Sequence, residues 1–221
     1  MNGYNRAVTI STLFFDLDDT LYPATSGLWE QIKNRIGMYM LERVGIPASE
    51  VQTLRRQLFE QYGTTLRGLQ INYNIDSADF LAYVHAVPLA DYIKPNPYLG
   101  AMIRSLPQRK FIFTNADSPH AKRVLRVLEL EDCFDGIIDI VAVQPYCKPM
   151  PPSFEIALKM AGEIDPKRCA LIDDMYRTTR AARQIGMVAI LYGGTGSYTD
   201  DDADAILTDW ADLPNVLERR K

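Results

Sequence analysis

Five short apolar runs lie along the chain, and each is rich in β-branched or aromatic residues. Between the later runs, apolar residues recur at the helical spacing of three to four positions. Short apolar runs that alternate with amphipathic helices are typical of a parallel sheet with helices on both faces. The pattern therefore predicts an α/β fold with a Rossmann-like parallel sheet in three layers, α/β/α. The predicted strands are Thr12–Phe15, Lys110–Phe113, Gly136–Val141, Cys169–Ile172 and Met187–Leu191, and the predicted helices are Ser118–Leu128, Pro152–Ala161 and Tyr176–Ile185.

The segment between the first two predicted strands does not fit a simple crossover. Residues 22–93 contain no strand-like run and show helical spacing instead, as at Leu28 and Ile32. Pro95 and Pro97 then mark a boundary, because paired prolines stop helices and stiffen the chain. We expect this segment to form a small inserted helical cap; the alternative is that its helices only thicken the core. The predicted division is an α/β core of residues 1–21 and 94–221 and a helical cap of residues 22–93.

Several predicted strands run directly into polar residues. The carboxyl ends of parallel strands meet at one edge of a sheet, which is where ligands bind in open α/β folds. Four carboxylates at one edge repel one another unless a cation lies among them, and carboxylate oxygens are ligands for a hard cation such as Mg²⁺. The sequence therefore predicts a metal site at this edge. The strand-end residues are Asp16 and Asp18, then Thr114 and Asn115, then Asp173 and Asp174.

Each candidate residue also has a simpler interpretation when it is taken alone. The segment from Asp16 to Thr20 can be a turn that caps the next helix, although such a turn would also leave Asp18 free to exchange a proton. Thr114 can hold phosphate oxygens, but threonines end many strands. Lys148 can neutralise both a carboxylate and a phosphate, but most lysines are solvated. The prediction of a shared functional site therefore depends on the spacing of all these residues together.

These residues, in this order, resemble the four motifs of the haloacid dehalogenase-like superfamily. The resemblance covers nearly the whole chain, and the predicted cap is placed as in the helical-cap class of that superfamily. The chain is similar in particular to the pyrimidine 5′-nucleotidase-like branch. The motif residues are Asp16–Thr20, Thr114, Lys148-Pro149 and Asp173-Asp174. The branch-like residues are Asp16–Pro23, Gly27–Trp29, Tyr62-Gly63, Leu66–Leu69, Ile75–Asp79, Tyr83–His85, Phe113–Asp117 with His120-Ala121, and Asp132–Gly136.

The resemblance implies a Mg²⁺-dependent phosphatase. In this interpretation Asp16 attacks phosphorus and forms a phospho-aspartate, and Asp18 protonates the leaving group and then activates water. Lys148 stabilises the nucleophile and the developing charge. Where relatives often carry a small polar residue after the paired acids, this chain has Met175, which puts local hydrogen bonding there in question. The implied catalytic residues are Asp16, Asp18, Thr114 and Lys148; the implied metal residues are Asp16, Asp18, Asp173 and Asp174; and the implied substrate-binding residues are Thr20, Tyr22, Trp29, His85 and Asn115.

The expected substrate is a small phosphorylated metabolite, by resemblance a pyrimidine nucleoside monophosphate such as UMP or CMP. Six of the 12 tyrosines fall in residues 22–93, where aromatic rings can stack on a base, although aromatics at helical spacing usually build a core. The alternatives are a broad-range small-metabolite phosphatase or a phosphosugar mutase. Asp18 disfavours a dehalogenase, because halide displacement needs no acid there. A non-catalytic protein on this fold is a further alternative, but Asp16 and Lys148 are both retained.

Composition excludes several other classes. A net charge of −4 with no basic block argues against nucleic acid polymers as partners, and no uncharged apolar run approaches the ~20 residues that span a bilayer. The first residues do not form a signal peptide, and three cysteines without a Cys-x-x-Cys pair indicate reduced core thiols in a cytoplasmic protein. The sequence contains no Gly-x-Ser-x-Gly motif, which argues against a serine hydrolase. Residues 193–197 lack a P-loop lysine and are expected to form a turn, and Asp200–Asp204 a solvated acidic loop. Oligomeric state is not predicted.

Overall fold

The computed structural model describes residues 9–193 and 198–218. Six parallel strands form one sheet in the order β3-β2-β1-β4-β5-β6. The first strand lies inside the sheet, between β2 and β4, and all its residues are buried. The strands are β1 (Thr12–Phe15), β2 (Arg109–Phe113), β3 (Gly136–Ile138), β4 (Cys169–Asp173), β5 (Val188–Tyr192) and β6 (Ala205–Leu207).

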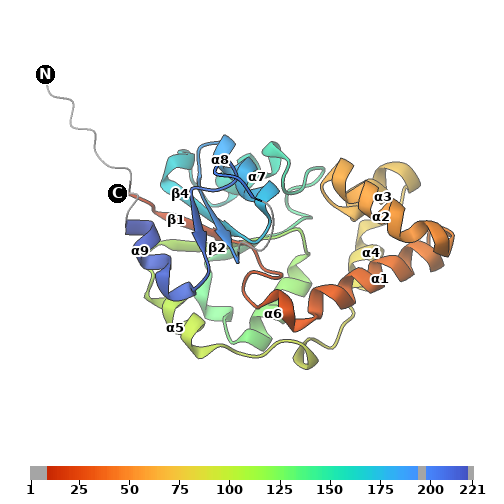
Figure 1. Ribbon diagram of the computed structural model, residues 1–221, viewed down its shortest axis with the longest axis horizontal. Helices are drawn as coiled ribbons and strands as arrows, with labels where there is room; N and C mark the ends of the chain where they lie inside the picture. The colour runs from red at the N-terminus through yellow and green to blue at the C-terminus, as the bar shows by residue number, and fades with distance from the viewer. Residues whose placement is uncertain (1–8, 194–197, 219–221) are drawn as a thin grey trace, which may run out of the picture.

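Helices cover both faces of this sheet, as Figure 1 shows. Side chains alternate along each strand, so Leu13 and Phe15 join one apolar core and Phe14 joins the other. The first core includes residues of α5 (Pro97–Ser105), α6 (Ser118–Leu128) and α9 (Leu213–Glu218). The second core includes residues of α7 (Pro151–Met160) and α8 (Tyr176–Gln184). The predicted three-layer α/β/α architecture is confirmed.

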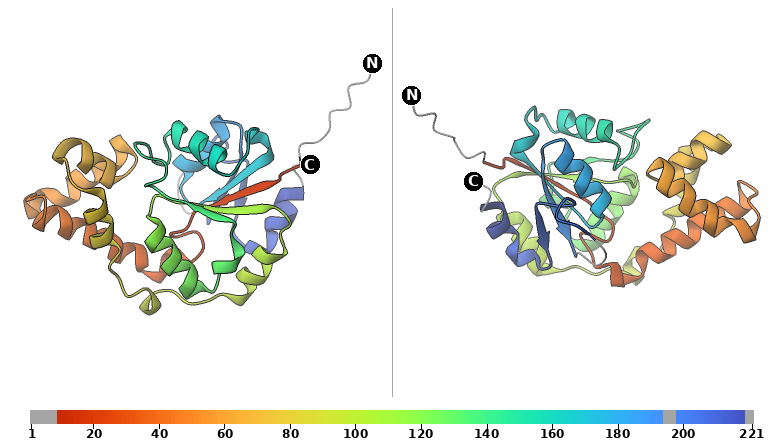
Figure 2. Two further views of the ribbon diagram at one scale, coloured as in Figure 1. Left: turned by 180° about the vertical axis from the view of Figure 1, so that it is seen from behind. Right: turned by 45° about the horizontal axis from the view of Figure 1, so that its top comes forward.

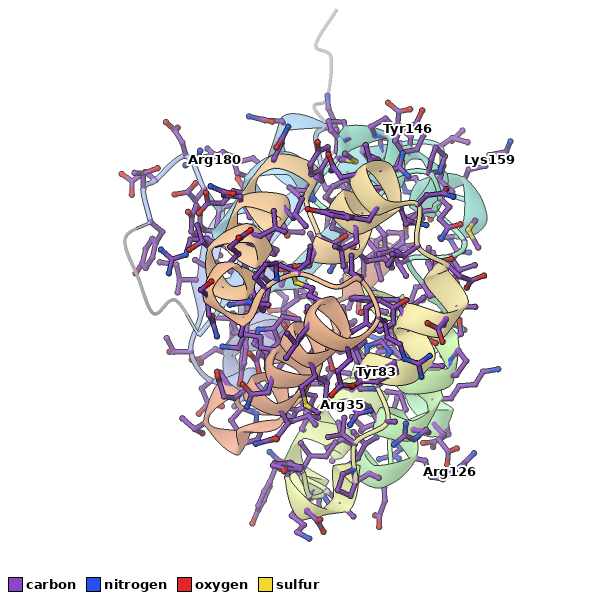
Figure 3. All side chains as sticks on the ribbon, turned by 90° about the vertical axis from the view of Figure 1, so that its right-hand side faces the viewer. Arg35, Tyr83, Arg126, Tyr146, Lys159 and Arg180 are labelled. Carbon is purple, nitrogen blue, oxygen red and sulfur yellow. The ribbon has the colours of Figure 1, made fainter. Side chains whose placement is uncertain are left out.

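Four helices after β1 lie to one side of the sheet, as Figure 1 and the two further views in Figure 2 show. They are α1 (Leu28–Glu42), α2 (Ala48–Tyr62), α3 (Thr65–Tyr73) and α4 (Ser77–Val84). The first of them packs against α2 and α4, and α2 packs against α3. Arg35 of α1 donates a hydrogen bond of 2.7 Å to the backbone oxygen of Tyr83 in α4 and lies over its ring (Figure 3). The division into a core and a cap at the boundaries given above stays a prediction.

Short 3₁₀ helices complete the described elements. They are η1 (Ala24–Ser26), η2 (Leu89–Asp91), η3 (Glu131–Cys133), η4 (Pro166–Arg168) and η5 (Trp210–Asp212). None of the helices in the described part of the chain is long and apolar enough to cross a membrane. The three cysteines, Cys133, Cys147 and Cys169, are buried and free, as predicted.

Two expectations about the second half of the chain were wrong. The strand expected over Gly136–Val141 ends at Ile138. It ends there because the Asp139 carboxylate accepts hydrogen bonds from the backbone N–H groups of Ser118 and Ala142, at 2.7 and 2.8 Å, and the chain turns.

The acidic run Asp200–Asp204 is not simply a solvated loop. The side chain of Asp202 is only 1% exposed and accepts hydrogen bonds from Arg180 and from the backbone of Thr199. The strand that follows, β6, was not predicted. Most of the turn expected over residues 193–197 lies outside the described residues.

Candidate active site

The carboxyl ends of β1, β2 and β4 bring polar residues from distant parts of the chain together. Phe15 pairs with Ile172, and the backbone N–H of Asp16 donates to the oxygen of Ile172 at 2.9 Å. This register places Asp16 beside Asp173, the last residue of β4. Thr114 follows β2, which is the other neighbour of β1. The sheet therefore assembles the strand-end residues that the sequence singled out.

Lys148 joins two of these carboxylates. Its Nζ lies 2.7 Å from Oδ1 of Asp16 and 2.6 Å from Oδ2 of Asp173, and the residue is only 3% exposed. Burial opposes the charged form, but the two carboxylates outweigh burial and raise the pKa of Lys148. The ammonium group is therefore charged and fixed between the two acids.

The loop that carries Lys148 is held by Asn115. The Asn115 side-chain amide donates to the backbone oxygen of Lys148, and its Oδ1 accepts from the backbone N–H of Lys148, both at 2.9 Å. This reciprocal pair connects the end of β2 to the loop before α7. Thr114 is 2% exposed, and its hydroxyl oxygen accepts from the backbone N–H of Ala116 at 3.0 Å. Both residues line the cavity described below, and their contacts to phosphate stay a prediction.

Three carboxylates form the group that best fits a cation. Asp16, Asp173 and Asp174 each offer an oxygen, and these oxygens all lie within 4.8 Å of one another. Burial raises the pKa of Asp16 to about 7 against the attraction of Lys148, and burial followed by repulsion from Asp173 raises the pKa of Asp174 to about 9. One lysine does not balance three acids, and an all-oxygen donor set suits Mg²⁺. The residues present therefore fit the predicted metal.

The turn after β1 adds a carboxylate that the sequence reasoning did not single out. Asp19 has φ of 58°, in the left-handed region that aspartate tolerates better than most residues. Asp19 lines the cavity described below, and its buried Oδ1 has no hydrogen-bond partner in the described part of the chain. Burial raises the pKa of Asp19 to about 6.

The hydroxyl of Thr20 donates to Oδ2 of Asp16 at 3.3 Å. Thr20 therefore supports the predicted nucleophile from within the fold.

Asp18 is held by two side chains through one oxygen. The hydroxyl of Tyr22 donates to Oδ1 of Asp18 at 2.7 Å, and Nε2 of His120 lies 3.0 Å from the same atom. Burial raises the pKa of Asp18, but His120 and the hydrogen bond from Tyr22 outweigh burial, so the pKa lies below its usual value. The sequence pointed to His120 only through the family resemblance, because nothing in the local sequence shows what its ring contacts.

A cavity of about 360 Å³ opens between this acidic edge and helices α1–α4. Trp29 and His85 line it, together with apolar residues such as Phe59 and Phe80. Thr20 and Tyr22 are not among its lining residues, and both are buried. Of the four substrate-binding candidates in or near the predicted cap, the structure thus brings Trp29 and His85 to the cavity, while Thr20 and Tyr22 contact Asp16 and Asp18 instead.

The main chain at Met175 supports one member of the acidic pair. Its backbone N–H donates to Oδ1 of Asp173 at 2.9 Å, and this contact does not depend on the side chain. The Met175 side chain lines the cavity instead. The backbone hydrogen bond is available to any residue other than proline at this position, so it does not replace a polar side chain there.

An aspartate–lysine cluster at the carboxyl edge of a Rossmann-like sheet is the arrangement expected from the resemblance to the haloacid dehalogenase-like superfamily. The haloacid dehalogenase-like hydrolase family matches the chain over residues 10–186, and the chain belongs to this family. The more specific likeness to the pyrimidine 5′-nucleotidase-like branch stays a prediction.

Two curated proteins and one solved structure are similar to this chain. Phosphate metabolism protein 8 of Saccharomyces cerevisiae is 29% identical over 93% of this chain and 72% of its own length. Glyceraldehyde 3-phosphate phosphatase of Pyrococcus furiosus is 30% identical over 95% of this chain and 94% of its own length. The HAD-hydrolase YfnB of Bacillus subtilis, solved bound to magnesium, has a TM-score of 0.63 at 15% identity and covers 95% of this chain and 99% of its own. The last likeness concerns the fold alone.

Proposed function

We propose that this protein is a Mg²⁺-dependent phosphomonoester hydrolase that works through a phospho-aspartate at Asp16. The observation that carries the proposal is the position of Lys148 between Asp16 and Asp173 at the acidic end of the cavity. A lysine there favours the ionised form of Asp16 and offers positive charge to an incoming phosphoryl group. Two relatives, one named for phosphate metabolism and one named as a phosphatase, support the same class of reaction.

In the first half of the reaction, a carboxylate oxygen of Asp16 attacks phosphorus. A bond forms between this oxygen and phosphorus, and the bond from phosphorus to the ester oxygen breaks. Asp18 gives its proton to the departing oxygen, which leaves as an alcohol. The Thr114 hydroxyl and the backbone N–H of Asn115 hold phosphoryl oxygens, and Lys148 offsets their charge.

In the second half, water attacks the phosphorus of phospho-Asp16. Asp18, now a carboxylate, takes a proton from that water, and the bond between phosphorus and the Asp16 oxygen breaks. Inorganic phosphate leaves, and Asp18 is again protonated for the next cycle. The two side chains that hold Oδ1 of Asp18 favour its ionised form, which suits this half-reaction.

Asp16, Asp174 and the backbone carbonyl of Asp18 would hold Mg²⁺, with Asp173 beside them. When bound, the ion supplies positive charge that lets a phosphate dianion enter a site lined by carboxylates. The raised pKa values of Asp16 and Asp174 support this assignment, because burial and then repulsion between the carboxylates disfavour their charged forms, and a bound cation would offset both effects.

For the substrate, we propose a pyrimidine nucleoside monophosphate. The cavity continues from the acidic edge to aromatic residues of the inserted helices, among them Trp29, Phe59 and Phe80. A flat base can stack on such rings, which contributes about 1–3 kcal/mol per base. Trp29→Ala should therefore raise KM for UMP by about 5- to 150-fold. KM for a ring-free ester such as β-glycerophosphate should stay unchanged, and an equal rise for both esters would contradict a stacking role.

A second candidate is a phosphatase for smaller metabolites. It is favoured by the relative named glyceraldehyde 3-phosphate phosphatase, which aligns with nearly the whole chain. A phosphosugar mutase would use the same residues but would transfer the phosphoryl group back to a sugar instead of to water.

The test is phosphate release with Mg²⁺ and with EDTA across UMP, CMP, dUMP, AMP, GMP and common sugar phosphates. Asp16→Asn, which keeps the shape of the side chain, should lower turnover by about 10⁴-fold or more. Preference for UMP or CMP would support the nucleotidase proposal, and preference for triose phosphates would support the second candidate. Isomerised sugar phosphate without phosphate release would indicate a mutase. Turnover that survives in EDTA or in Asp16→Asn would contradict the proposed mechanism.

A further inference from the structure

Two side chains meet one oxygen of Asp18 from inside the fold. Tyr22 lies at 2.7 Å and His120 at 3.0 Å from Oδ1. Tyr22 is 3% exposed, the His120 side chain is fully buried, and neither lines the cavity. They therefore contact Asp18 on the side away from the substrate space.

The chemistry of the contact decides which nitrogen of His120 carries the proton. An ionised carboxylate only accepts hydrogen bonds, so Nε2 must donate. Nδ1 of His120 is buried and has no hydrogen-bond partner within residues 9–193 and 198–218. A proton on Nδ1 would leave a buried donor unpaired, which costs more than an unused acceptor. The contact therefore has a donor at Nε2 and is directional.

The ring of His120 is itself held in place. It stacks on the ring of His85, with centroids 4.1 Å apart and an angle of 18° between the planes. Asp117 accepts from Nδ1 of His85 at 2.8 Å and from the backbone N–H of His120 at 3.3 Å. His85 directly follows α4, and His120 lies in the first turn of α6, so the two rings join the inserted helices to the sheet-covering layer.

We infer that His120 and Tyr22 are positioning residues that clamp Oδ1 of Asp18 and leave Oδ2 as the oxygen that exchanges protons. Oδ2 makes no hydrogen bond to a residue that the structure describes, while the Asp18 side chain is 14% exposed and lines the cavity. A carboxylate fixed at one oxygen presents the other in one direction, which is what proton transfer requires. This inference rests on the proposed function, because it concerns the acid/base of that reaction.

The inference is tested by separating the two half-reactions. With a nucleoside monophosphate, Tyr22→Phe and His120→Leu should each lower kcat by about 10- to 100-fold with KM within twofold, a part of the ~10²–10⁴-fold that acid/base catalysis supplies. With p-nitrophenyl phosphate, whose leaving group needs no proton, a rapid-quench experiment should show a preserved burst of nitrophenolate followed by slow turnover. A burst slowed as much as kcat would indicate general damage to the site and would overturn the inference.

Conservative variants distinguish a hydrogen bond from packing. His120→Gln places an amide N–H where Nε2 lies and should recover most of the activity that His120→Leu loses. Tyr83→Phe is a matched control, because it also removes a 2.7 Å tyrosine–carboxylate hydrogen bond, to Glu42, but one that is exposed to solvent and lies outside the cavity. It should leave kcat unchanged.

The outcomes distinguish a failure of the positioning role from a failure of the proposed function. Wild-type turnover that depends on Asp16, together with unchanged kcat in folded Tyr22→Phe, would overturn the positioning role and leave the proposed function intact. Tyr22→Phe keeps the ring and so remains informative even if His120→Leu does not fold. Absence of Asp16-dependent turnover in the wild-type protein would overturn the proposed function and this inference with it.

Discussion

Lys148 is a single buried cation between two buried carboxylates, at 2.7 Å from Asp16 and 2.6 Å from Asp173. Desolvation of buried charges is costly, so such a group is stable only while each member keeps its partners. Removal of the lysine would leave two like charges facing each other. The same residue therefore carries part of the stability of the sheet edge and part of the proposed chemistry.

We predict that Lys148→Met destabilises the protein by about 3–5 kcal/mol and abolishes turnover. The measurement is urea unfolding at pH 8 in EDTA, together with kcat in Mg²⁺. In the double variant Lys148→Met/Asp173→Asn one of the stranded charges is gone, so part of the lost stability should return while activity does not. Full stability in Lys148→Met alone would show that the ion pairs contribute little.

Single residues of the site differ in whether the sequence alone could identify them. Asp16 and Asp173 were found because each follows an apolar strand, and the order of strands in a parallel sheet brings such ends together. His120 contacts Asp18 across 102 positions of sequence. That contact depends on how α6 starts after β2, and no local pattern encodes it.

Among the elements, the turn between α2 and α3 lies against the loop that carries Lys148. Gly63 has φ of +89°, and a Cβ there would come within 2.8 Å of Sγ of Cys147 and 3.2 Å of the backbone oxygen of Lys148. Arg177 of α8 also donates to the backbone oxygen of Gly63 at 3.1 Å. The inserted helices are thus fixed to the sheet layers at this turn, close to the proposed site.

We predict that Gly63→Ala destabilises the protein and lowers kcat, because the loop must move to admit the new methyl group. Gly45→Ala is the matched control, since Gly45 has φ of +81° but nothing within 4 Å of its Cβ position. Both variants share a backbone cost of about 1–2 kcal/mol. Gly63→Ala should lose a further 1–3 kcal/mol or so from overpacking. Equal unfolding free energies and equal kcat values for the two variants would contradict this account.

Whether a strand or helix could be predicted from the sequence depended on its length and on the residue that ends it. The strands with several buried apolar residues were found, and the helix Ser118–Leu128 was placed at its observed bounds. The strand β6 has only three residues, Ala205–Leu207, so its apolar run is too short to be recognised as a strand. The strand from Gly136 was drawn too long because the apolar pattern continues past Asp139, whose side chain ends the pairing.

For the molecule as a whole, the unbalanced acids make stability depend on pH. Asp16 and Asp174 have folded-state pKa values of about 7 and about 9, above the usual value of 3.8. The folded protein therefore binds these protons more tightly than the unfolded chain does. Their contribution favours folding at low pH and is lost as pH rises from about 4 toward 9.

We predict that, in EDTA, the Tm falls between pH 5 and pH 8 and that Mg²⁺ restores it at pH 8, because a bound cation stabilises the folded state by linkage. Asp174→Asn should show a smaller fall in Tm and a smaller response to Mg²⁺. Differential scanning fluorimetry at both pH values measures these changes. An equal response to Mg²⁺ in both proteins would exclude Asp174 as a ligand.

The placement of β1 between β2 and β4 has a consequence for how the protein is made. Thr12 pairs with Arg109 on one side and with Cys169 on the other, so the strand emerges from the ribosome long before its second neighbour exists. Until then one side of β1 presents unpaired backbone groups, the kind of open edge that promotes aggregation. Such long-range parallel pairing also forms slowly. During synthesis the chain therefore passes through a stage in which Asp16 is present but its partner Asp173 is not, and at that stage we expect the nascent protein to be prone to aggregation.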